Sequence, residues 1–211
     1  MLIEDRNRRT RLRLLIKKLN KERKQQAKKI DILCNDFITA QKNFIKKLNT
    51  ITFATNFYES ILGTTDLAAL LHTCVRLIRD EIDDVNVTFF LRQEDNFQLH
   101  IFESEQSTTL ENQHFENCFT VELIDNICKS NKICALDDMF AMGLEGSLTG
   151  LNKISAVTIP LGLAGSSLGF MLIYRSSENK LTSEELNNIT AVTSGLSQAI
   201  QSCQTLLNST D

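Results

Sequence analysis

Six cysteines are the residues of this sequence with the widest chemical repertoire, since a thiol can act as a nucleophile, a redox group or a zinc ligand. They form no C-x-x-C pair, and the closest two, Cys128 and Cys134, have five residues between them. Most lie in apolar stretches, where a free Cys behaves as a small hydrophobic residue. We predict reduced, mostly buried thiols, with a zinc site or a redox switch as the alternative. The six are Cys34, Cys74, Cys118, Cys128, Cys134 and Cys203.

Two acidic pairs are the next candidates for chemistry. Asp137-Asp138 could accept hydrogen bonds from a ligand or bind a cation, and the alternative is a solvated turn. Asp83-Asp84 is interpreted as the loop between a helix and a strand. No Gly-rich phosphate loop, His-containing metal motif or Ser/His/Asp constellation accompanies them. The sequence therefore predicts a protein that is not an enzyme.

The net charge of −3 conceals two segments of opposite sign. Residues 1–48 hold 15 Lys and Arg against 5 Asp and Glu, a net charge of +10. Residues 49–211 hold 8 against 21, a net charge of −13. The basic segment could attract nucleic acid or an anionic membrane surface. It has few aromatic residues and no base-reading motif, so we expect a solvated helix face and no specific nucleic-acid partner.

The 211 residues suffice for one domain of ordinary size plus an extension. With 42% hydrophobic and 23% charged residues, the composition is that of a soluble globular chain. No apolar run approaches the roughly 20 residues of a membrane span. The first twenty residues lack the apolar core of a secretory signal. We therefore expect a cytoplasmic protein.

An apolar repeat with alternating spacings of four and three residues runs from Leu12 to Phe44, without an intervening Gly or Pro. Such spacing places a stripe along one side of a helix, which can be buried only against another helix. After Phe44 the frame slips at Leu48, which locally unwinds a supercoil. We predict a long coiled-coil helix over residues 1–56 that pairs in a parallel homodimer, with a helix folded back on its own domain as the alternative. The predicted dimer seam includes Ile30, Leu33, Phe37 and Phe44.

Residues 57–211 are predicted to form one mixed domain. Gly63-Thr64-Thr65-Asp66 supplies capping oxygens for a helix over about 66–82. The polar stretch 103–117 predicts a loop, and three glycines predict a mobile segment over 139–152. Apolar periodicity predicts hairpin strands at 85–91 and 97–102, a short helix at 121–129, a short strand at 133–136, and a second hairpin with strands at 154–160 and 168–174 around a turn at 162–166.

The last predicted helix is the best marked. Thr182 with Glu185 three residues later forms a capping box, and Leu181 and Leu186 stand at the hydrophobic-staple positions. Its apolar face again follows spacings of four and three residues. We therefore expect this helix to join the dimer seam through Ile189, Val192, Leu196 and Ala199.

The order of these elements resembles a GAF domain over about residues 57–207. The resemblance rests first on the helix to Ile82 that leads into the strand from Val85, and on residues 123–132 followed by Asp137-Asp138. Its strongest part is Ile159-Pro160-Leu161, a turn, Leu168-Gly169 in the next strand, and the acid-rich helix start at 181–186.

The resemblance implies an α+β fold, with an antiparallel sheet of five or six strands between two helical layers. The first and last helices of such domains commonly mediate dimerisation, and the irregular middle closes a pocket over the sheet. The candidate pocket residues are therefore Thr88, Phe90, Phe119, Ile124, Asp137, Asp138, Met139, Phe140 and Thr158.

Members of the family bind cyclic nucleotides, tetrapyrroles, haem or small metabolites, and some bind nothing. The Asn-Lys pair of cyclic-nucleotide binders is replaced at the strand end by Tyr174-Arg175, and Asn179-Lys180 lies close to the final helix instead. A bilin needs a reactive Cys near a His, and His114 precedes Cys118 only within a polar stretch. The cofactor therefore stays unknown.

Three functions follow. The first is a sensory GAF module that dimerises through its flanking helices and controls an effector or partner protein, which in this family usually follows at a point corresponding to Asp211. The second is a scaffolding protein whose basic arm binds nucleic acid, membrane or a partner protein. The third is a thiol redox sensor, or a thiol reductase like some members of the family, although the spacing of Cys118, Cys128 and Cys134 does not match theirs.

Overall fold

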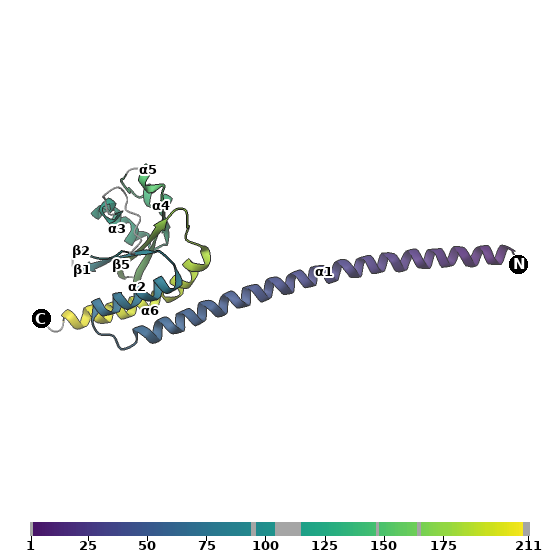
Figure 1. Ribbon diagram of the computed structural model, residues 1–211, viewed down its shortest axis with the longest axis horizontal. Helices are drawn as coiled ribbons and strands as arrows, with labels where there is room; N and C mark the ends of the chain where they lie inside the picture. The colour runs from purple at the N-terminus through teal and green to yellow at the C-terminus, as the bar shows by residue number, and fades with distance from the viewer. Residues whose placement is uncertain (1, 94–95, 104–114, 147, 164–165, 209–211) are drawn as a thin grey trace. The chain divides into compact units, whose positions relative to one another are not determined.

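The computed structural model describes residues 2–93, 96–103, 115–146, 148–163 and 166–208 (Figure 1). The chain divides into two compact units, Met1–Asn49 and Thr50–Asp211. The second unit begins earlier than residue 57, the predicted boundary. The reason is that Phe53 and Ala54 pack against its core and Thr50 Oγ1 donates a hydrogen bond to Asn188 Oδ1 at 2.6 Å.

The helix α1 runs without interruption from Leu2 to Ile61, in keeping with the absence of Gly and Pro in this stretch. Its apolar stripe is not buried within the first unit. The side chains of Ile30, Leu33, Phe37 and Phe44 are between 58% and 70% exposed. A helix that buries none of its apolar stripe gains nothing from packing, and packing is the main source of helix stability in proteins.

The second unit contains one antiparallel sheet in the order β2-β1-β5-β4-β3. This confirms the predicted sheet and both predicted hairpins. Two strands extend into the predicted turn, because residues 162–163 and 166–167 still pair across β4 and β5. The strands are β1 Asn86–Gln93, β2 Asn96–Phe102, β3 Cys134–Ala135, β4 Ile154–Leu163 and β5 Ser166–Ser176.

Helices cover both faces of the sheet, as Figure 1 shows. One face carries α2 (Leu67–Glu81) and α6 (Ser183–Asn208), together with the last turns of α1. The side chain of Asp66 caps α2 by accepting a hydrogen bond from the Ala69 N–H at 2.7 Å, as the sequence predicted. The other face carries the 3-10 helix η1 (Phe115–Cys118), α3 (Val121–Ser130), α4 (Leu136–Ala141) and α5 (Leu148–Leu151).

The middle of the chain is more ordered than its glycines predicted. The described part of the expected mobile segment over 139–152 contains the end of α4 and all of α5, and it buries Met139, Leu144 and Leu151. Leu136 opens α4 instead of ending β3, so β3 has only two residues. Of the predicted loop over 103–117, residues 104–114 lie outside the described residues, and the remainder contains the start of η1.

The side chains of β1 alternate between two hydrophobic cores, because successive residues of a strand point to opposite faces. Phe89 and its neighbours two residues away join the core beneath α2 and α6, whereas Phe90 joins the core beneath α3 and α4. Ile189, Val192 and Leu196 are at most 1% exposed in the first of these cores. They pack on the sheet of their own chain, so they do not form a dimer seam as predicted, and half-buried Ala199 packs beside them.

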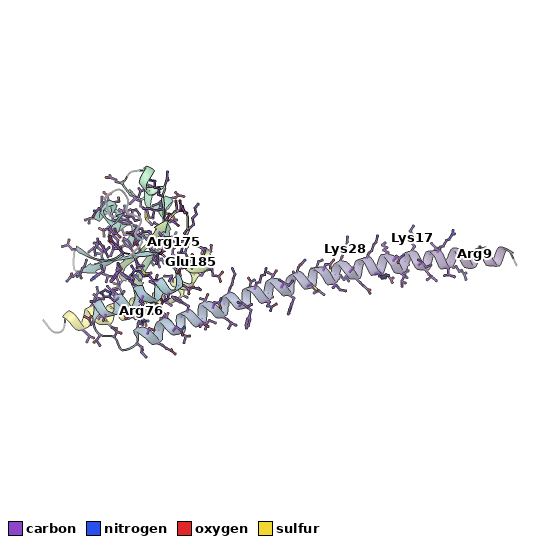
Figure 2. All side chains as sticks on the ribbon, in the orientation of Figure 1. Arg9, Lys17, Lys28, Arg76, Arg175 and Glu185 are labelled. Atoms are coloured by element: carbon purple, nitrogen blue, oxygen red, sulfur yellow. The ribbon has the colours of Figure 1, made fainter. Side chains whose placement is uncertain are left out.

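A buried arginine joins three segments at one end of the sheet (Figure 2). Arg175 on β5 is 3% exposed and donates from Nη2 to Glu185 Oε2 at 2.9 Å. It also donates to the backbone oxygens of Lys180 at 2.7 Å and of Asp83 at 3.4 Å. Glu185 accepts from the Thr182 N–H at 2.6 Å, and its own N–H donates to Thr182 Oγ1 at 3.2 Å. These two bonds are the predicted capping box of α6.

The cysteines are distributed as the apolar context predicted. Cys74, Cys128, Cys134 and Cys203 are buried, Cys118 is half-buried and Cys34 is exposed. Burial raises the pKa of the Cys74 thiol to about 12. Of the helices in the described residues, none has the length and apolar character to span a membrane.

Candidate functional site

The pocket-side face of the sheet presents a row of four side chains from four strands. Thr88 pairs with Leu172, Leu172 pairs with Thr158, and Thr158 pairs with Cys134. Directly opposed residues of neighbouring strands lie on the same face. The two predicted site threonines therefore share one row and are completely buried.

Most of the other predicted pocket residues line the same layer. Phe90 continues the sheet face beside Thr88, and its ring stacks on that of Phe170 with 4.6 Å between centroids. Phe119, Ile124 and Met139 belong to the segments that cover this face of the sheet and are buried. Phe140 is half-buried. Seven of the nine predicted pocket residues therefore lie together in one layer.

Asp137 and Asp138 are the exceptions. Both are exposed in the first turn of α4, and Asp138 Oδ2 accepts a hydrogen bond from the Ala135 N–H at 2.9 Å. Acidic residues are favoured at this end of a helix because they complement its dipole and its free N–H groups. The pair is therefore solvated at the start of a helix and does not line the buried layer, and its role as a ligand contact stays a prediction.

Glu116 in η1 places a buried carboxyl group in this layer. It is 3% exposed, and its Oε1 accepts two hydrogen bonds. Thr88 Oγ1 donates one at 2.6 Å, and Tyr174 Oη donates the other at 2.9 Å. The second carboxyl oxygen, Oε2, is buried and has no hydrogen-bond partner among the described residues.

A half-satisfied buried carboxyl group is energetically unusual. Carboxylates are almost never fully buried without a partner, and a buried polar atom without one costs about 1–3 kcal/mol. Burial and then the charge of Glu116 raise the pKa of Tyr174 well above its usual range. The phenol therefore stays protonated and remains a donor to Oε1, and Oε2 is the carboxyl oxygen without a partner among the described residues.

The surroundings of Glu116 are aromatic. The ring of Phe115 lies edge-on to the rings of Phe119 at 5.3 Å and Tyr174 at 5.2 Å between centroids. A buried carboxylate beside aromatic rings suits a ligand that combines a hydrogen-bond donor or a positive charge with a flat apolar body.

Two thiols of the layer have raised pKa values, which lowers their reactivity. Burial raises the pKa of Cys128, and burial together with the charge of Glu116 raises that of Cys118. Since the thiolate is the reactive form, both shifts disfavour covalent attachment at neutral pH. Within the described residues, no three His, Cys, Asp or Glu side chains are grouped as metal ligands.

Sequence reasoning missed Glu116 because it lies in the polar, non-periodic stretch that predicted a loop. Two aromatic residues, Phe115 and Phe119, flank it closely, and this spacing was the available hint of a buried segment. Tyr174 was noted only as the end of a strand. The sheet register pairs Tyr174 with Asn86, which is two residues from Thr88 on β1. Tyr174 and Thr88 are therefore close enough to donate to the same carboxyl oxygen of Glu116.

No known protein family matches the sequence, and no curated protein matches it either. Solved structures, however, resemble the fold. A proposed GAF sensor protein from Burkholderia vietnamiensis superposes with a TM-score of 0.55 at 14% identity, over 75% of this chain and 98% of that one.

Two further structures cover similar shares of the chain. The GAF domain of an Acinetobacter phosphoenolpyruvate-protein phosphotransferase gives a TM-score of 0.54 at 12% identity, over 75% of this chain and 97% of that one. The protein JSC1_58120g3, with bound biliverdin IXa, gives 0.51 at 16% identity, over 72% of this chain and 99% of that one. These likenesses establish a GAF-type fold and confirm the resemblance found in the sequence.

Proposed function

We propose that this chain, which has a GAF-type fold, is a regulatory module that binds a small molecule in the layer between its sheet and α3–α5. The observation that carries the proposal is the buried Glu116, with one carboxyl oxygen held by Thr88 and Tyr174 and the other without a partner among the described residues. A ligand with a protonated nitrogen would complete this carboxylate by a charge-assisted hydrogen bond. The biliverdin-bound JSC1_58120g3 domain supports the general idea that this fold holds a small molecule.

In the proposed mechanism, the ligand shifts a balance between two packings of the unit. Glu116 connects η1 to β1 and β5 through its hydrogen bonds, so a ligand there would alter how the covering segments sit on the sheet. Such a shift requires a difference in affinity between the two packings. We propose that the flanking helices carry the change to an effector domain or a partner protein.

Dimerisation through α1 is part of the proposal. A stripe of exposed apolar side chains repeats along its first unit, and another copy of the same stripe is the surface that matches it best. Eight residues in the two heptad positions that flank this stripe, e and g, bear on how so basic a helix could pair. In a parallel, in-register pair they juxtapose Leu15 with Asn20, Glu22 with Ala27, Lys29 with Cys34, and Asp36 with Gln41. None of these four pairs brings like charges together, whereas Arg23, which lies on the stripe itself, would meet its own copy.

Mass spectrometry of small molecules released from denatured protein tests the ligand proposal. We compare wild type with Glu116→Gln, in which the amide oxygen still accepts from Thr88 and Tyr174 but the negative charge is lost. We expect a nitrogen base to co-purify with wild type, and the variant to retain about tenfold less, as losing a bond to a charged group implies. Glu122→Gln, at an exposed carboxylate in the first turn of α3, is the matched control and should retain it.

Equal retention by wild type and Glu116→Gln would contradict the proposal, as would a released compound without a basic nitrogen. If nothing co-purifies, thermal unfolding is measured with agmatine and histamine as probes. The proposal then requires a stabilisation by at least one probe that Glu116→Gln abolishes, and no stabilisation by any of them would overturn it.

A further inference from the structure

A groove opens between α2 and β2, on the face of the sheet opposite to Glu116. Its volume is about 570 Å³, and it is lined by α2 side chains on one side and by Phe102 of β2 on the other. Phe102 packs against the core beneath α2 and α6, which places the groove on that face. A cavity of this size is in the range of small-molecule sites.

Three nitrogen-bearing side chains follow one stripe of α2 along this groove. His72, Arg76 and Arg79 are separated by four and three residues, so they lie one above another on the same side of the helix. Arg76 is exposed and is labelled in Figure 2. One carboxylate, that of Asp80, also lines the groove, so the lining contains two guanidinium groups and one acid.

Arg79 is the residue that points to a ligand. Its side chain is half-buried, and its Nε and Nη2 atoms are withdrawn from solvent without a hydrogen-bond partner among the described residues. A guanidinium group presents a planar array of donors that matches the oxygens of phosphate or carboxylate groups. An oxyanion in the groove would give Arg79 the acceptor that it lacks among the described residues.

The rest of the lining suits an apolar body attached to that anion. Phe102 and Val75 offer an aromatic ring and an aliphatic surface. The ring of His72 stands edge-on to Phe102, with 4.9 Å between centroids and an interplanar angle of 85°. A flat group that enters beside Phe102 would bring its oxyanion towards the two arginines.

We propose that the α2–β2 groove is a second binding site, for a small molecule that carries a phosphate or carboxylate group on a flat apolar body. The site lies across the sheet from Glu116 and has the opposite charge, so it does not depend on the ligand proposed there. An organic anion at α2 would contact the helical layer directly, whereas the Glu116 ligand would reach it only through the sheet.

Calorimetric titration of the full chain tests this site with AMP, inorganic phosphate, benzoate and adenosine as probes. The basic α1 also attracts anions, so the informative quantity is the difference between variants at one salt concentration. We expect Arg79→Gln to weaken AMP binding about tenfold or more and Arg76→Gln to weaken it less, since Arg76 is more exposed. Adenosine, which lacks the oxyanion, should bind far more weakly than AMP.

Two control variants separate the groove from the rest of the positive charge. Arg92→Gln removes a guanidinium that pairs with Asp125 at 3.2 Å, and Arg23→Gln removes one from α1. Both should leave AMP affinity within about twofold, as expected for exposed charges. The relative affinities of phosphate and benzoate tell which oxyanion the groove prefers, and preference for either supports the proposal.

An NMR titration that follows the His72 ring provides a second readout, which remains usable if Arg79→Gln is destabilised. At the same subsaturating concentration, AMP should shift the His72 resonances in wild type and shift them less in Arg76→Gln. The proposal is overturned if no anion binds at millimolar concentration, or if adenosine binds as well as AMP. It is also overturned if both arginine variants in the groove match wild type, or if His72 does not respond.

Discussion

At Gly169 the backbone of β5 passes so close to β1 that no side chain fits between the strands. Its φ is +128°, and an added Cβ would lie 1.8 Å from the carbonyl oxygen of Phe90. The neighbouring residues, Leu168 and Phe170, point to opposite cores. The Leu-Gly pair that contributed to the family resemblance thus has a physical cause, which is the close approach of two central strands.

Gly169→Ala should therefore be severely destabilising. We expect the free energy of unfolding to fall by about 3 kcal/mol or more, because both backbone strain and a clash with backbone atoms must be relieved. Chemical denaturation measures the change. Gly143→Ala is the matched control, since Gly143 has a φ of +106° but open space around its Cβ position. It should lose only about 1–2 kcal/mol from strain, and equal losses at the two positions would contradict the close-approach explanation.

At the scale of elements, Arg175 determines how α6 leaves the sheet. It joins β5 to the first turn of α6, to the loop before that helix and to the turn after α2. The side chains of the Arg175–Glu185 ion pair are only 4% and 18% exposed, so water competes for it little. Removing one partner of a buried pair leaves the other charge uncompensated.

Arg175→Met should lower the free energy of unfolding by about 3 kcal/mol, as loss of one partner from a buried pair implies.

Burial alone would raise the pKa of Glu185, but the hydrogen bonds from Thr182 and the charge of Arg175 outweigh it and lower that pKa. The stabilisation by Glu185 is therefore present above its unfolded pKa of about 4.3 and is lost as pH falls through the lower folded value.

Denaturation of wild type and Glu185→Gln from neutral to acidic pH checks this pH dependence. The difference in stability should be largest at neutral pH and should shrink only in the acid range. Glu178→Gln, at an exposed carboxylate in the preceding loop, is the control and should differ little from wild type at any pH. A difference between wild type and Glu185→Gln that stays constant with pH would contradict the assigned role of the ion pair.

Elements with several local signals were predictable, and those defined by contacts were not. Asp66 and the Thr182–Glu185 box fixed two helix starts because capping acts within four residues of the chain. The helix α4 has six residues, too few for periodicity to register, and the glycines around it hid the burial of Met139 and Leu144. Glu116 and Arg79 could not be predicted as site residues. Glu116 depends on hydrogen bonds from two strands distant in sequence, and Arg79 on guanidinium atoms without a partner among the described residues.

At the scale of the whole molecule, the predicted dimer seam was too large, because it included the apolar stripe of α6. An apolar stripe with spacings of four and three residues suits a sheet as well as a second helix, and on α6 the sheet of the same chain covers it. On α1 the described apolar side chains of the first unit are exposed. The dimer prediction therefore rests on α1 alone.

Crosslinking at Leu33 tests that dimer. In a parallel, in-register pair the two copies of this position face each other closely enough for a disulfide, which needs Cα atoms within about 7 Å. In a Cys34→Ser background, we expect Leu33→Cys to give a crosslinked dimer under mild oxidation. Ile38→Cys, on another side of the helix, should not.

Equal crosslinking at both positions would indicate random collisions and contradict a defined seam. A monomer in sedimentation at micromolar concentration would also contradict it. An antiparallel pair would place the two Leu33 copies apart and leave Leu33→Cys uncrosslinked.

The distribution of the cysteines has a practical consequence. The five thiols of the second unit are buried or half-buried, whereas Cys34 is exposed on α1. A maleimide dye or nitroxide should therefore attach to the helix first and leave the core thiols untouched, because they are shielded from the reagent. The native sequence therefore provides a labelling site for a spectroscopic reporter on α1, the helix through which we propose that the protein dimerises.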